Sequence, residues 1–325
     1  MRNVIVGAIA TAALALGLGA IATAQQQAAP AAQMPTVPPS KWGPADEIGA
    51  ANYMTPQLVS QAARLIKTGK VYSLGITVNT KTPAFPPRSC AIYIVQPGQT
   101  GSSNGLGPTR TTYNDDILNC WTGIGTQLDG LGHIGAGDTY YNGNKWADIA
   151  QMGGLKKLGV DKVPPIVGRG VLLDMAAYYG VDVVKEGTAF NRREIEEVAK
   201  RQGVEIRQGD VVIFHTGWLS IIDKDPKRFG EVEPGLGRDG ARFLVSRGVV
   251  AVGADTWGLE AIPFEQGAGV FEVHQILLTL NGTYILENIN TAELARDKAY
   301  EFMFVLGHNK YEGAVQSMIN PVAIR

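Results

Sequence analysis

The feature that most constrains the fold is a set of short apolar segments separated by charged, amphipathic ones. Residues 166–175, 211–216 and 249–254 are largely apolar runs rich in Val, Ile and Leu, which are typical of strands buried on both faces of a sheet. Between the first two runs, Asn191 begins a capping-box-like charged helix that ends at Gly203. Strands and helices do not alternate strictly, so the pattern favours one α/β domain with a mixed sheet over a Rossmann fold or TIM barrel.

The same reasoning predicts the remaining elements from caps, breakers and periodicity. Helices are expected over residues 55–67, with Thr55 as N-cap, and over 146–152, 239–247 and 291–298. Strands are expected over residues 71–78, 91–95, 284–288 and 300–307, and residues 275–281 form an apolar segment that closes on a turn.

The first 24 residues have the pattern of a secretory signal peptide: a short positive start, an apolar run, and the small residues Ala22-Thr23-Ala24 before a cleavage point. A membrane anchor is the competing interpretation, because the run approaches the length of a span. The Ala-x-Ala ending favours cleavage. Residues 25–40, rich in Gln, Ala and Pro, predict a flexible leader, and 41–325 the folded domain. We therefore expect an exported protein, periplasmic or secreted, that is free of the membrane after cleavage.

Charge and cysteine content narrow the classes of partner. The formal net charge is −1 and no block of basic residues stands out, which argues against nucleic acid as a partner and favours a small-molecule substrate. Cys90 and Cys120 could pair in an exported protein or remain as two buried thiols. Any imidazole site must draw on four histidines: His133, His215, His274 and His308.

The stretch GTQLDGLGH, residues 125–133, combines a carboxamide, a carboxylate and an imidazole among glycines. Asp129 and His133 are four residues apart, which brings them together on one helical face or across a tight loop. Gln127 and Asp129 share a face if the segment is extended. These ligand types indicate a candidate metal site. A glycine-rich turn in which Asp129 caps a helix is the alternative for this stretch alone.

Two further polar residues are embedded in apolar surroundings. His274 precedes the apolar segment 275–281, and Glu287 ends an apolar strand, where a carboxylate is costly unless it is paired, hydrogen-bonded or metal-bound. A salt bridge or a backbone cap would satisfy Glu287 equally well. Together with Asp129 and His133 they make a set of two histidines and two carboxylates, which suits Zn²⁺ or Mn²⁺.

Other candidates depend on neighbouring sequence. His215 lies inside an apolar strand and is expected to be a packed, hydrogen-bonded histidine. Asp255 follows another apolar strand, where it would either support a metal ligand from behind or cap the next turn. Phe85, Trp121 and Trp257 are candidates to hold a flat ring, although aromatic residues more often belong to a core.

The chain resembles the cyclase family of metal-dependent hydrolases, which includes bacterial kynurenine formamidase (arylformamidase) and isatin hydrolase. The resemblance extends over most of residues 41–325. It is carried by the order and spacing of DEIGAANYMTP, GTQLDGLGH, PPIVGRGVLLD, GDVVIFHTGW, GADTWGLE, VHQILLTLNGTYILEN and YEFMFVL. The fold that it implies is a compact α/β domain with a central mixed, β-barrel-like sheet flanked by helices. Members are usually dimeric, so a homodimer is expected.

This sequence departs from the family signature, which has the form His-x-Gly-Thr-His-x-Asp-x-x-x-His. The first His falls on Gly123 and the second on Gln127, which removes two imidazoles that ligate metal in formamidase-like members. Gln127 still offers a carbonyl oxygen, a harder and weaker ligand. A weaker or displaced metal, a shift from Zn²⁺ towards Mn²⁺, or no metal at all would follow. Four positions match: Gly125, Thr126, Asp129 and His133.

The family's later His and Glu match His274 and Glu287. The resemblance thus implies a metal set of Gln127, Asp129, His133, His274 and Glu287, with His133 or His274 moving a proton and Glu287 completing the shell or acting as base. The implied reaction is hydrolysis of an amide, formamide, lactam or lactone by a metal-activated water. Two alternatives stay open: a lyase or dehydratase acting on a cyclic substrate, and a metal-free exported binding protein, which the missing histidines motivate.

Overall fold

The computed structural model describes residues 34–95 and 105–325. The expected signal peptide and most of the expected leader lie outside the described residues, and residues 34–40 contain no helix or strand. No helix in the described part of the chain is long and apolar enough to cross a membrane.

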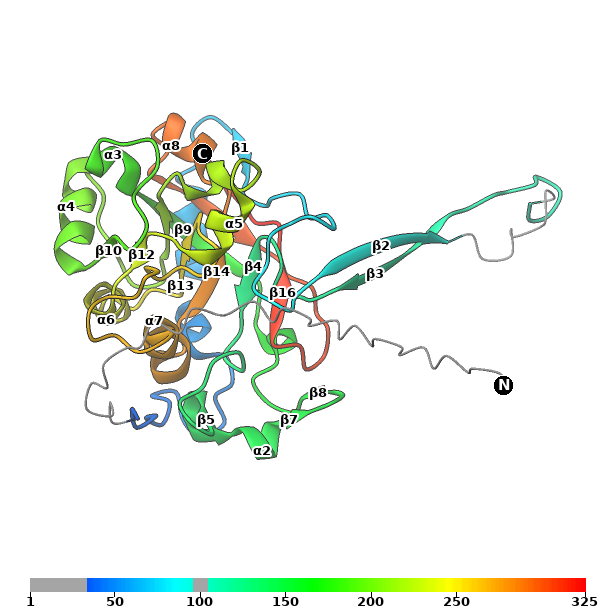
Figure 1. Cartoon of the computed structure of the whole chain (residues 1–325), viewed down its shortest axis with the longest axis horizontal. Coiled ribbons are helices and arrows are strands. Elements are labelled where there is room, and N and C mark those ends of the chain that lie inside the picture. Colours follow the sequence, from blue (N-terminus) through cyan, green and yellow to red (C-terminus); the bar gives the residue numbers. More distant parts are fainter. Residues whose placement is uncertain (1–33, 96–104) are drawn as a thin grey trace, which may run out of the picture. The chain divides into compact units, whose positions relative to one another are not determined.

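A mixed sheet of nine strands organises the described residues (Figure 1). Four central strands run parallel, and the strands on either side of them run antiparallel. The sheet curls as a half-barrel, so the prediction of one α/β domain built on a mixed, barrel-like sheet is confirmed. In order across the sheet the strands are β1 (Val71–Ser73), β17 (Val322–Ile324), β15 (Glu301–Leu306), β9 (Ile166–Asp174), β11 (Val211–His215), β13 (Ala251–Ala254), β14 (Tyr284–Glu287), β4 (Gln127–Asp129) and β16 (Gln316–Met318).

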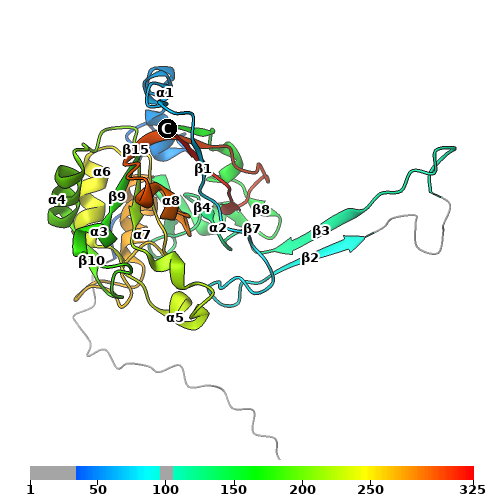
Figure 2. The same ribbon diagram turned by 90° about the horizontal axis from the view of Figure 1, so that it is seen from above.

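Helices cover this sheet, and their bounds follow local signals in the sequence. Helix α4 packs on β9 and on α6, and α1 packs on β9 and β15; Figure 2 shows α4 and α6 side by side. The helices are α1 (Pro56–Ala63), α2 (Trp146–Ile149), α3 (Met175–Tyr179), α4 (Arg192–Gln202), α5 (Pro226–Glu231), α6 (Arg238–Ser246), α7 (Glu272–His274) and α8 (Ala292–Arg296). A π-helix (Gln275–Thr279) continues α7, and short 3₁₀ helices are η1 (Gly49–Tyr53), η2 (Tyr141–Gly143), η3 (Val160–Lys162) and η4 (Trp218–Ile221).

Two predicted helix caps are confirmed. The Thr55 side chain accepts a hydrogen bond from the Leu58 amide, 3.3 Å away, at the start of α1. At α4 the Glu194 carboxylate accepts from the Asn191 amide at 3.0 Å, and Gly203 ends the helix with a φ of 68°, a conformation that favours glycine. Local capping chemistry was therefore sufficient to locate these ends.

Some expected bounds were wrong. The strand predicted over 71–78 ends at Ser73. The Leu74 amide still donates to the Pro321 carbonyl, but Pro321 has no N–H to return the bond, and the Ile76 amide donates to the Thr126 side chain. The helix predicted over 146–152 stops at Ile149, after which β7 (Ala150–Gln151) pairs with β8 (Gly154–Leu155). Tertiary partners decided both cases. Other small pairs are β5 (Thr139–Tyr140) with β6 (Asn144–Lys145) and β10 (Ala189–Phe190) with β12 (Gly235–Leu236).

A hairpin of β2 (Cys90–Val95) and β3 (Asp115–Cys120) forms its own two-stranded sheet (Figure 1). Its first pair is Cys90 opposite Cys120, and the two sulfurs form a disulfide, which resolves the alternative that the sequence left open. Several apolar side chains of the hairpin are more than half exposed: Ile92, Tyr93, Ile94, Ile117 and Leu118. Because the hairpin pairs with no strand of the main sheet, the disulfide is the covalent tie that holds its base together.

Replacing Cys90 and Cys120 by Ser should loosen the hairpin without unfolding the domain, since its opening is a local event. We expect faster proteolysis within residues 90–120 and a loss of stability below the roughly 2–5 kcal/mol typical of a disulfide that closes a whole domain. Limited proteolysis read by mass spectrometry, with thermal unfolding alongside, checks this. A Ser89→Ala variant is the control. Global unfolding of the double variant would contradict a local role.

Candidate metal centre

The register of two neighbouring strands sets the polar face of the centre. In the antiparallel pair β4–β14, Glu287 lies opposite Gln127 and Ile285 lies opposite Asp129. Side chains alternate along a strand, so Gln127 and Asp129 point to one face, and cross-strand pairing brings Glu287 to the same face. Glu287 ends the parallel strand β14, and the carboxyl ends of parallel strands are where open α/β sheets bind ligands. The extended arrangement of Gln127 and Asp129 is thus the one observed.

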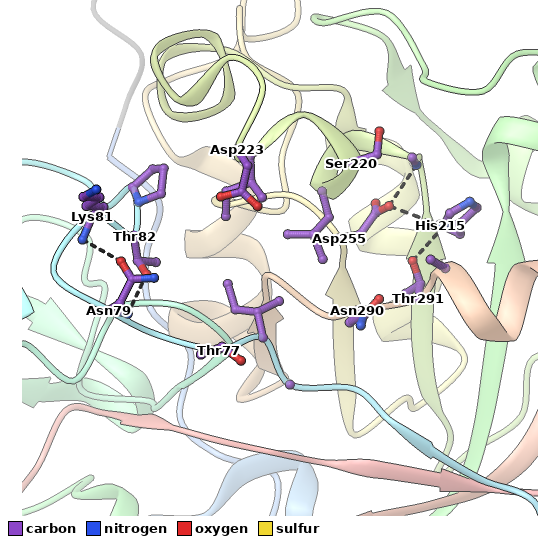
Figure 3. Close-up of a pocket in the computed structure, with 17 residues that line it drawn as sticks. Thr77, Asn79, Lys81, Thr82, His215, Ser220, Asp223, Asp255, Asn290 and Thr291 are labelled. Carbon is purple, nitrogen blue, oxygen red and sulfur yellow. Dashed lines mark hydrogen bonds and ion pairs between the residues drawn. The ribbon is translucent and has the colours of Figure 1, made fainter.

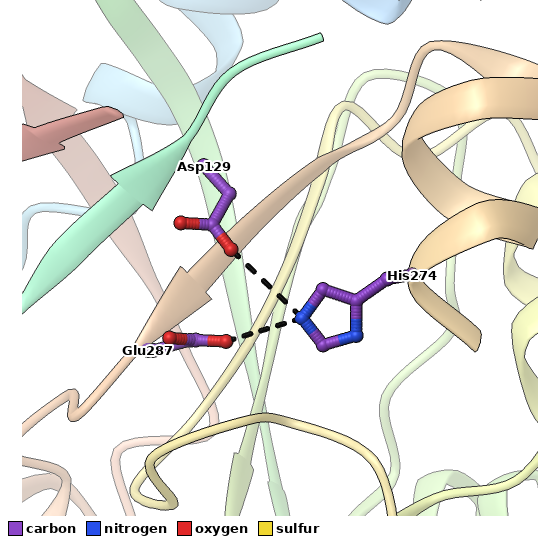
Figure 4. A group of neighbouring side chains, drawn as sticks. All are labelled: Asp129, His274 and Glu287. Carbon is purple, nitrogen blue, oxygen red and sulfur yellow. Dashed lines mark hydrogen bonds and ion pairs between the residues drawn. The ribbon is translucent and has the colours of Figure 1, made fainter. Parts of the chain in front are cut away.

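His274 completes a buried group with Asp129 and Glu287 (Figure 4). Its Nε2 lies 3.3 Å from Glu287 Oε1 and 3.9 Å from Asp129 Oδ2. The three residues are at most 4 % exposed. Asp129 Oδ2 is buried and has no hydrogen-bond partner, which is costly for a carboxylate oxygen. One imidazole and two carboxylates converging on such an orphaned atom fit a divalent cation such as Zn²⁺ or Mn²⁺.

Glu260 fixes the orientation of the His274 ring. The Glu260 carboxylate lies 2.6 Å from His274 Nδ1 and also accepts from the His274 backbone amide at 3.2 Å. Nδ1 therefore keeps its proton directed at Glu260, and Nε2 faces Asp129 and Glu287, where its lone pair would be offered to a bound ion. The sequence analysis missed Glu260, because only its place in a loop after an apolar strand marked it out.

The crowding of buried carboxylates shifts the pKa values of the side chains in this group. Burial and the Asp129 charge raise the pKa of Glu287 to about 8. Burial lowers the pKa of His274, but the hydrogen bonds to Glu260 and Glu287 outweigh it and raise the pKa to about 10. Burial, reinforced by Glu287, also raises the pKa of Glu233. A divalent ion would favour the ionised carboxylates and the neutral imidazole instead.

Gln127 and His133, both expected as ligands, lie at the edge of this group. The Gln127 amide nitrogen donates to Asp129 Oδ1 at 3.2 Å and to Glu287 Oε2 at 2.5 Å, so it holds the two carboxylates in place. His133 Nε2 lies 3.9 Å from Asp129 Oδ2, and the side chain keeps 18 % of its surface exposed. Burial lowers the pKa of His133, with the positive charges of His274 and Arg88 acting in the same direction. His133 is thus a neutral, partly exposed imidazole beside the buried group, and such an imidazole can accept a proton.

Aromatic rings extend from the group towards solvent. Phe271 lies edge-on to His274 with ring centroids 5.1 Å apart, and Phe85 lies edge-on to Phe271 at 6.1 Å. Phe85 also stacks on Trp257 at 5.9 Å. Two of the three expected ring-binding residues, Phe85 and Trp257, thus form one aromatic wall beside the metal group. Trp121 is half exposed, and no ring contact joins it to this wall in the described residues.

Asp255 belongs to a different environment. Its carboxylate accepts hydrogen bonds from the Thr216 amide and hydroxyl and from the Gly217 amide, and it lies 3.4 Å from His215 Nδ1. None of these bonds reaches the metal group, so Asp255 supports the loop after β11. His215 is hydrogen-bonded to Thr291 at 2.7 Å, as expected of a packed histidine. Burial lowers the pKa of His215, but the Asp255 hydrogen bond and the negative charges of Asp255 and Asp174 together outweigh burial and raise the pKa.

Asp255 and His215 line a cavity of about 560 Å³ at the carboxyl ends of β11 and β13 (Figure 3). The other side chains around it are mainly polar, among them Asn79, Lys81 and Asp223. Asp129, His274 and Glu287 are not among its lining residues. The cavity and the metal group are therefore separate features of the same sheet edge.

The family model of the putative cyclases matches residues 72–261 of the sequence. The chain belongs to the cyclase family. A crystal structure described as a novel cyclase is 32 % identical, with a TM-score of 0.79, over 88 % of this chain and 98 % of that one. A comparison with curated proteins finds no match.

More distant structures share the fold of this cyclase-family chain. Isatin hydrolase A from Ralstonia solanacearum is 18 % identical, with a TM-score of 0.60, over 83 % of this chain and 97 % of its own. A structure described as a potential metal-dependent hydrolase with cyclase activity is 17 % identical, with a TM-score of 0.50, over 78 % of this chain and 98 % of its own.

Replacing Glu260 by Gln should weaken metal binding about 10- to 100-fold, the usual effect of removing the group that orients a ligating histidine. The amide keeps the shape but removes the negative charge that holds the proton on His274 Nδ1. Titration of Zn²⁺ and Mn²⁺ against a competing chromophoric chelator measures this. The exposed Glu205→Gln is the matched control, and equal affinity of all three proteins would contradict the assigned role.

Proposed function

We propose that this cyclase-family protein is a metal-dependent hydrolase that cleaves an amide, formamide, lactam or lactone bond in a small molecule. The observation that carries the proposal is the buried group of Asp129, His274 and Glu287 with an unpartnered carboxylate oxygen at its centre. The names of its structural neighbours, isatin hydrolase and a potential metal-dependent hydrolase, support it. Hydrolysis is the reaction that such a centre performs in a family of this kind.

Asp129, His274 and Glu287 would hold one divalent ion, Zn²⁺ or Mn²⁺. When bound there, such an ion lowers the pKa of a water molecule and polarises a carbonyl. Glu260 keeps His274 in the tautomer that presents Nε2, and the Gln127 amide keeps both carboxylates turned towards that nitrogen. The arrangement of the ligands is therefore set by hydrogen bonds before any ion arrives.

The remaining steps fall to side chains at the mouth of the group. His133 is partly exposed and its pKa is lowered, so near neutral pH it is available to take a proton from the attacking water. The wall of Phe85 and Trp257 is flat and apolar, which suits a planar ring lying beside His274. An aryl amide or a fused-ring lactam has both a carbonyl that water can attack and a planar ring that can lie against this wall.

The deciding experiment is elemental analysis of protein purified without chelator, followed by a screen of aryl formamides, lactams and lactones. We expect near-stoichiometric Zn or Mn and formation of one carboxylate per turnover. Asp129→Asn, which keeps the shape of the side chain, should lose both the metal and at least about 100-fold in kcat/KM, because one ligand charge is removed.

Asp138→Asn is the matched control for that variant, since the Asp138 carboxylate is exposed and contacts Lys145 and Thr139 at the surface. It should keep metal and turnover. A wild-type protein that contains no metal and refuses added Zn²⁺ and Mn²⁺ would overturn the proposal, as would full activity of Asp129→Asn.

We also propose that the protein works outside the cytoplasm. The signal-like residues 1–24 and the disulfide between Cys90 and Cys120 support this, because disulfides persist in oxidising compartments. Expression of the full chain in a bacterium should give a periplasmic protein. Its mass, measured by mass spectrometry, should correspond to a chain that starts at Gln25. Ala22→Asp should block processing, since cleavage needs small residues. An uncleaved wild-type chain in the cytoplasm or the membrane fraction would contradict export.

A further inference from the structure

The place of the signature's first imidazole is filled by other side chains of this protein. A Cβ atom at Gly123 would lie 2.6 Å from Gln316 Oε1 and 2.8 Å from Arg88 Nη1. Contacts this short force a neighbour to move, so any side chain at Gly123 would displace the amide or the guanidinium. Glycine at this position is what lets Arg88 and Gln316 approach the metal group.

Both side chains are tied to the centre. Gln316 lies on β16 opposite Asp129 of β4, and its amide nitrogen donates to Asp129 Oδ1 at 2.7 Å. Arg88 Nη1 donates to the Gly123 carbonyl at 2.9 Å. The positive charge of Arg88 contributes to lowering the pKa of His133 and opposes the rise in the pKa of Glu287. The guanidinium therefore lies within electrostatic reach of the metal group.

The Arg88 guanidinium has N–H groups that are not used in hydrogen bonds within the described residues. A guanidinium carries five N–H groups, yet the bond to the Gly123 carbonyl is the one hydrogen bond that the Arg88 guanidinium makes within the described residues, where no carboxylate pairs with it. The side chain is half buried, and its guanidinium lies 6.0 Å from the centre of the Phe85 ring. It thus lies beside Phe85 of the aromatic wall and beside Gln316, which contacts Asp129, with unused hydrogen-bonding capacity.

Local structure keeps the guanidinium there. Arg88 precedes Cys90 by two residues, and the disulfide to Cys120 joins its segment to the one that leads to Gly123. The Trp121 amide donates to the Ser89 carbonyl at 3.1 Å, next to that disulfide. The base of the hairpin therefore holds the Arg88 backbone against the chain that carries its acceptor.

We propose that Arg88 anchors the reacting oxygen of the substrate: the carbonyl oxygen of the scissile bond and then the product carboxylate. In hydrolysis the carbonyl carbon gains a bond to the water oxygen and loses its bond to the leaving nitrogen or oxygen, which takes up a proton. The acid formed releases a proton and becomes a carboxylate. Negative charge thus grows on the oxygen that a guanidinium binds best. This rests on the proposed function and assigns it a further residue.

The test uses benzoate, a product-like aryl carboxylate, and benzamide, a neutral molecule of the same shape. Both are titrated calorimetrically into the purified mature protein. Arg88→Met should weaken benzoate binding about 10- to 100-fold, the effect of losing a charge-assisted hydrogen bond. It should weaken benzamide binding less, because a neutral carbonyl oxygen accepts a weaker hydrogen bond from the guanidinium than a carboxylate does. Arg88→Lys should restore part of the benzoate affinity, because an ammonium keeps the charge without the planar fork.

Arg193→Met is the control, because Arg193 is a largely exposed cation paired with Glu194. It should bind both ligands as the wild type does. Gly123→Ala should also weaken benzoate binding, since the added methyl displaces the guanidinium without removing its charge. Equal benzoate affinity of Arg88→Met and the wild type would overturn the proposal, and so would equal losses for benzoate and benzamide.

Metal content, measured on every variant, separates this proposal from the proposed function. Arg88→Met should retain the wild-type content, because the metal group keeps Asp129, His274 and Glu287. A wild type without metal would reject the hydrolase. Even then, loss of the preference for benzoate over benzamide in Arg88→Met would establish Arg88 as an anion site. If Arg88→Met kept the wild-type preference, the anion site would be rejected.

Discussion

The burial of several carboxylates around one imidazole is the constraint on which the centre depends. Asp129, Glu233, Glu260 and Glu287 are each at most 4 % exposed, and a buried charge is tolerated only with partners. Glu260 has His274, Glu287 has the Gln127 amide, and Glu233 accepts from the backbone amides after β13 at 2.8 and 3.0 Å. Asp129 alone keeps an oxygen without a partner. A bound cation would balance the group.

The departure from the family signature is compensated by other side chains of this protein. Where the signature has two imidazoles, this chain has Gly123 and Gln127, and the space is shared by a carboxamide from β16 and a guanidinium from the loop before β2. Imidazole is a metal ligand, whereas these groups donate hydrogen bonds. The exchange leaves Asp129, His274 and Glu287 to hold a metal and provides Arg88 for an anionic oxygen. The loss of two histidines therefore places hydrogen-bond donors beside the metal group where the signature has metal ligands.

The hairpin links this chemistry to the fold. Phe85 and Arg88 come just before Cys90 in the chain, and Gly123 comes just after Cys120. The disulfide therefore joins the two segments that carry these residues. An aromatic wall and a cation both depend on the position of this one loop, which pairs with no strand of the main sheet. An oxidising environment would thus preserve the disulfide that closes the base of the hairpin. Export and the architecture of the site are consistent with one another.

The sequence alone was enough to predict features that depend on residues adjacent along the chain. Apolar runs located β9, β11 and β13, and caps located the start of α1 and the end of α4, because burial and capping leave local patterns. Residue type and spacing made Asp129 a candidate in the glycine-rich stretch 125–133, the cost of a charge in an apolar strand singled out Glu287, and the family resemblance added support for His274. Only the tertiary structure decided their partners: Glu260, Gln316 and Arg88 come from a loop, an edge strand and the base of a hairpin. Strand register and chain crossing bring them together, and neither leaves a periodic signal in the sequence.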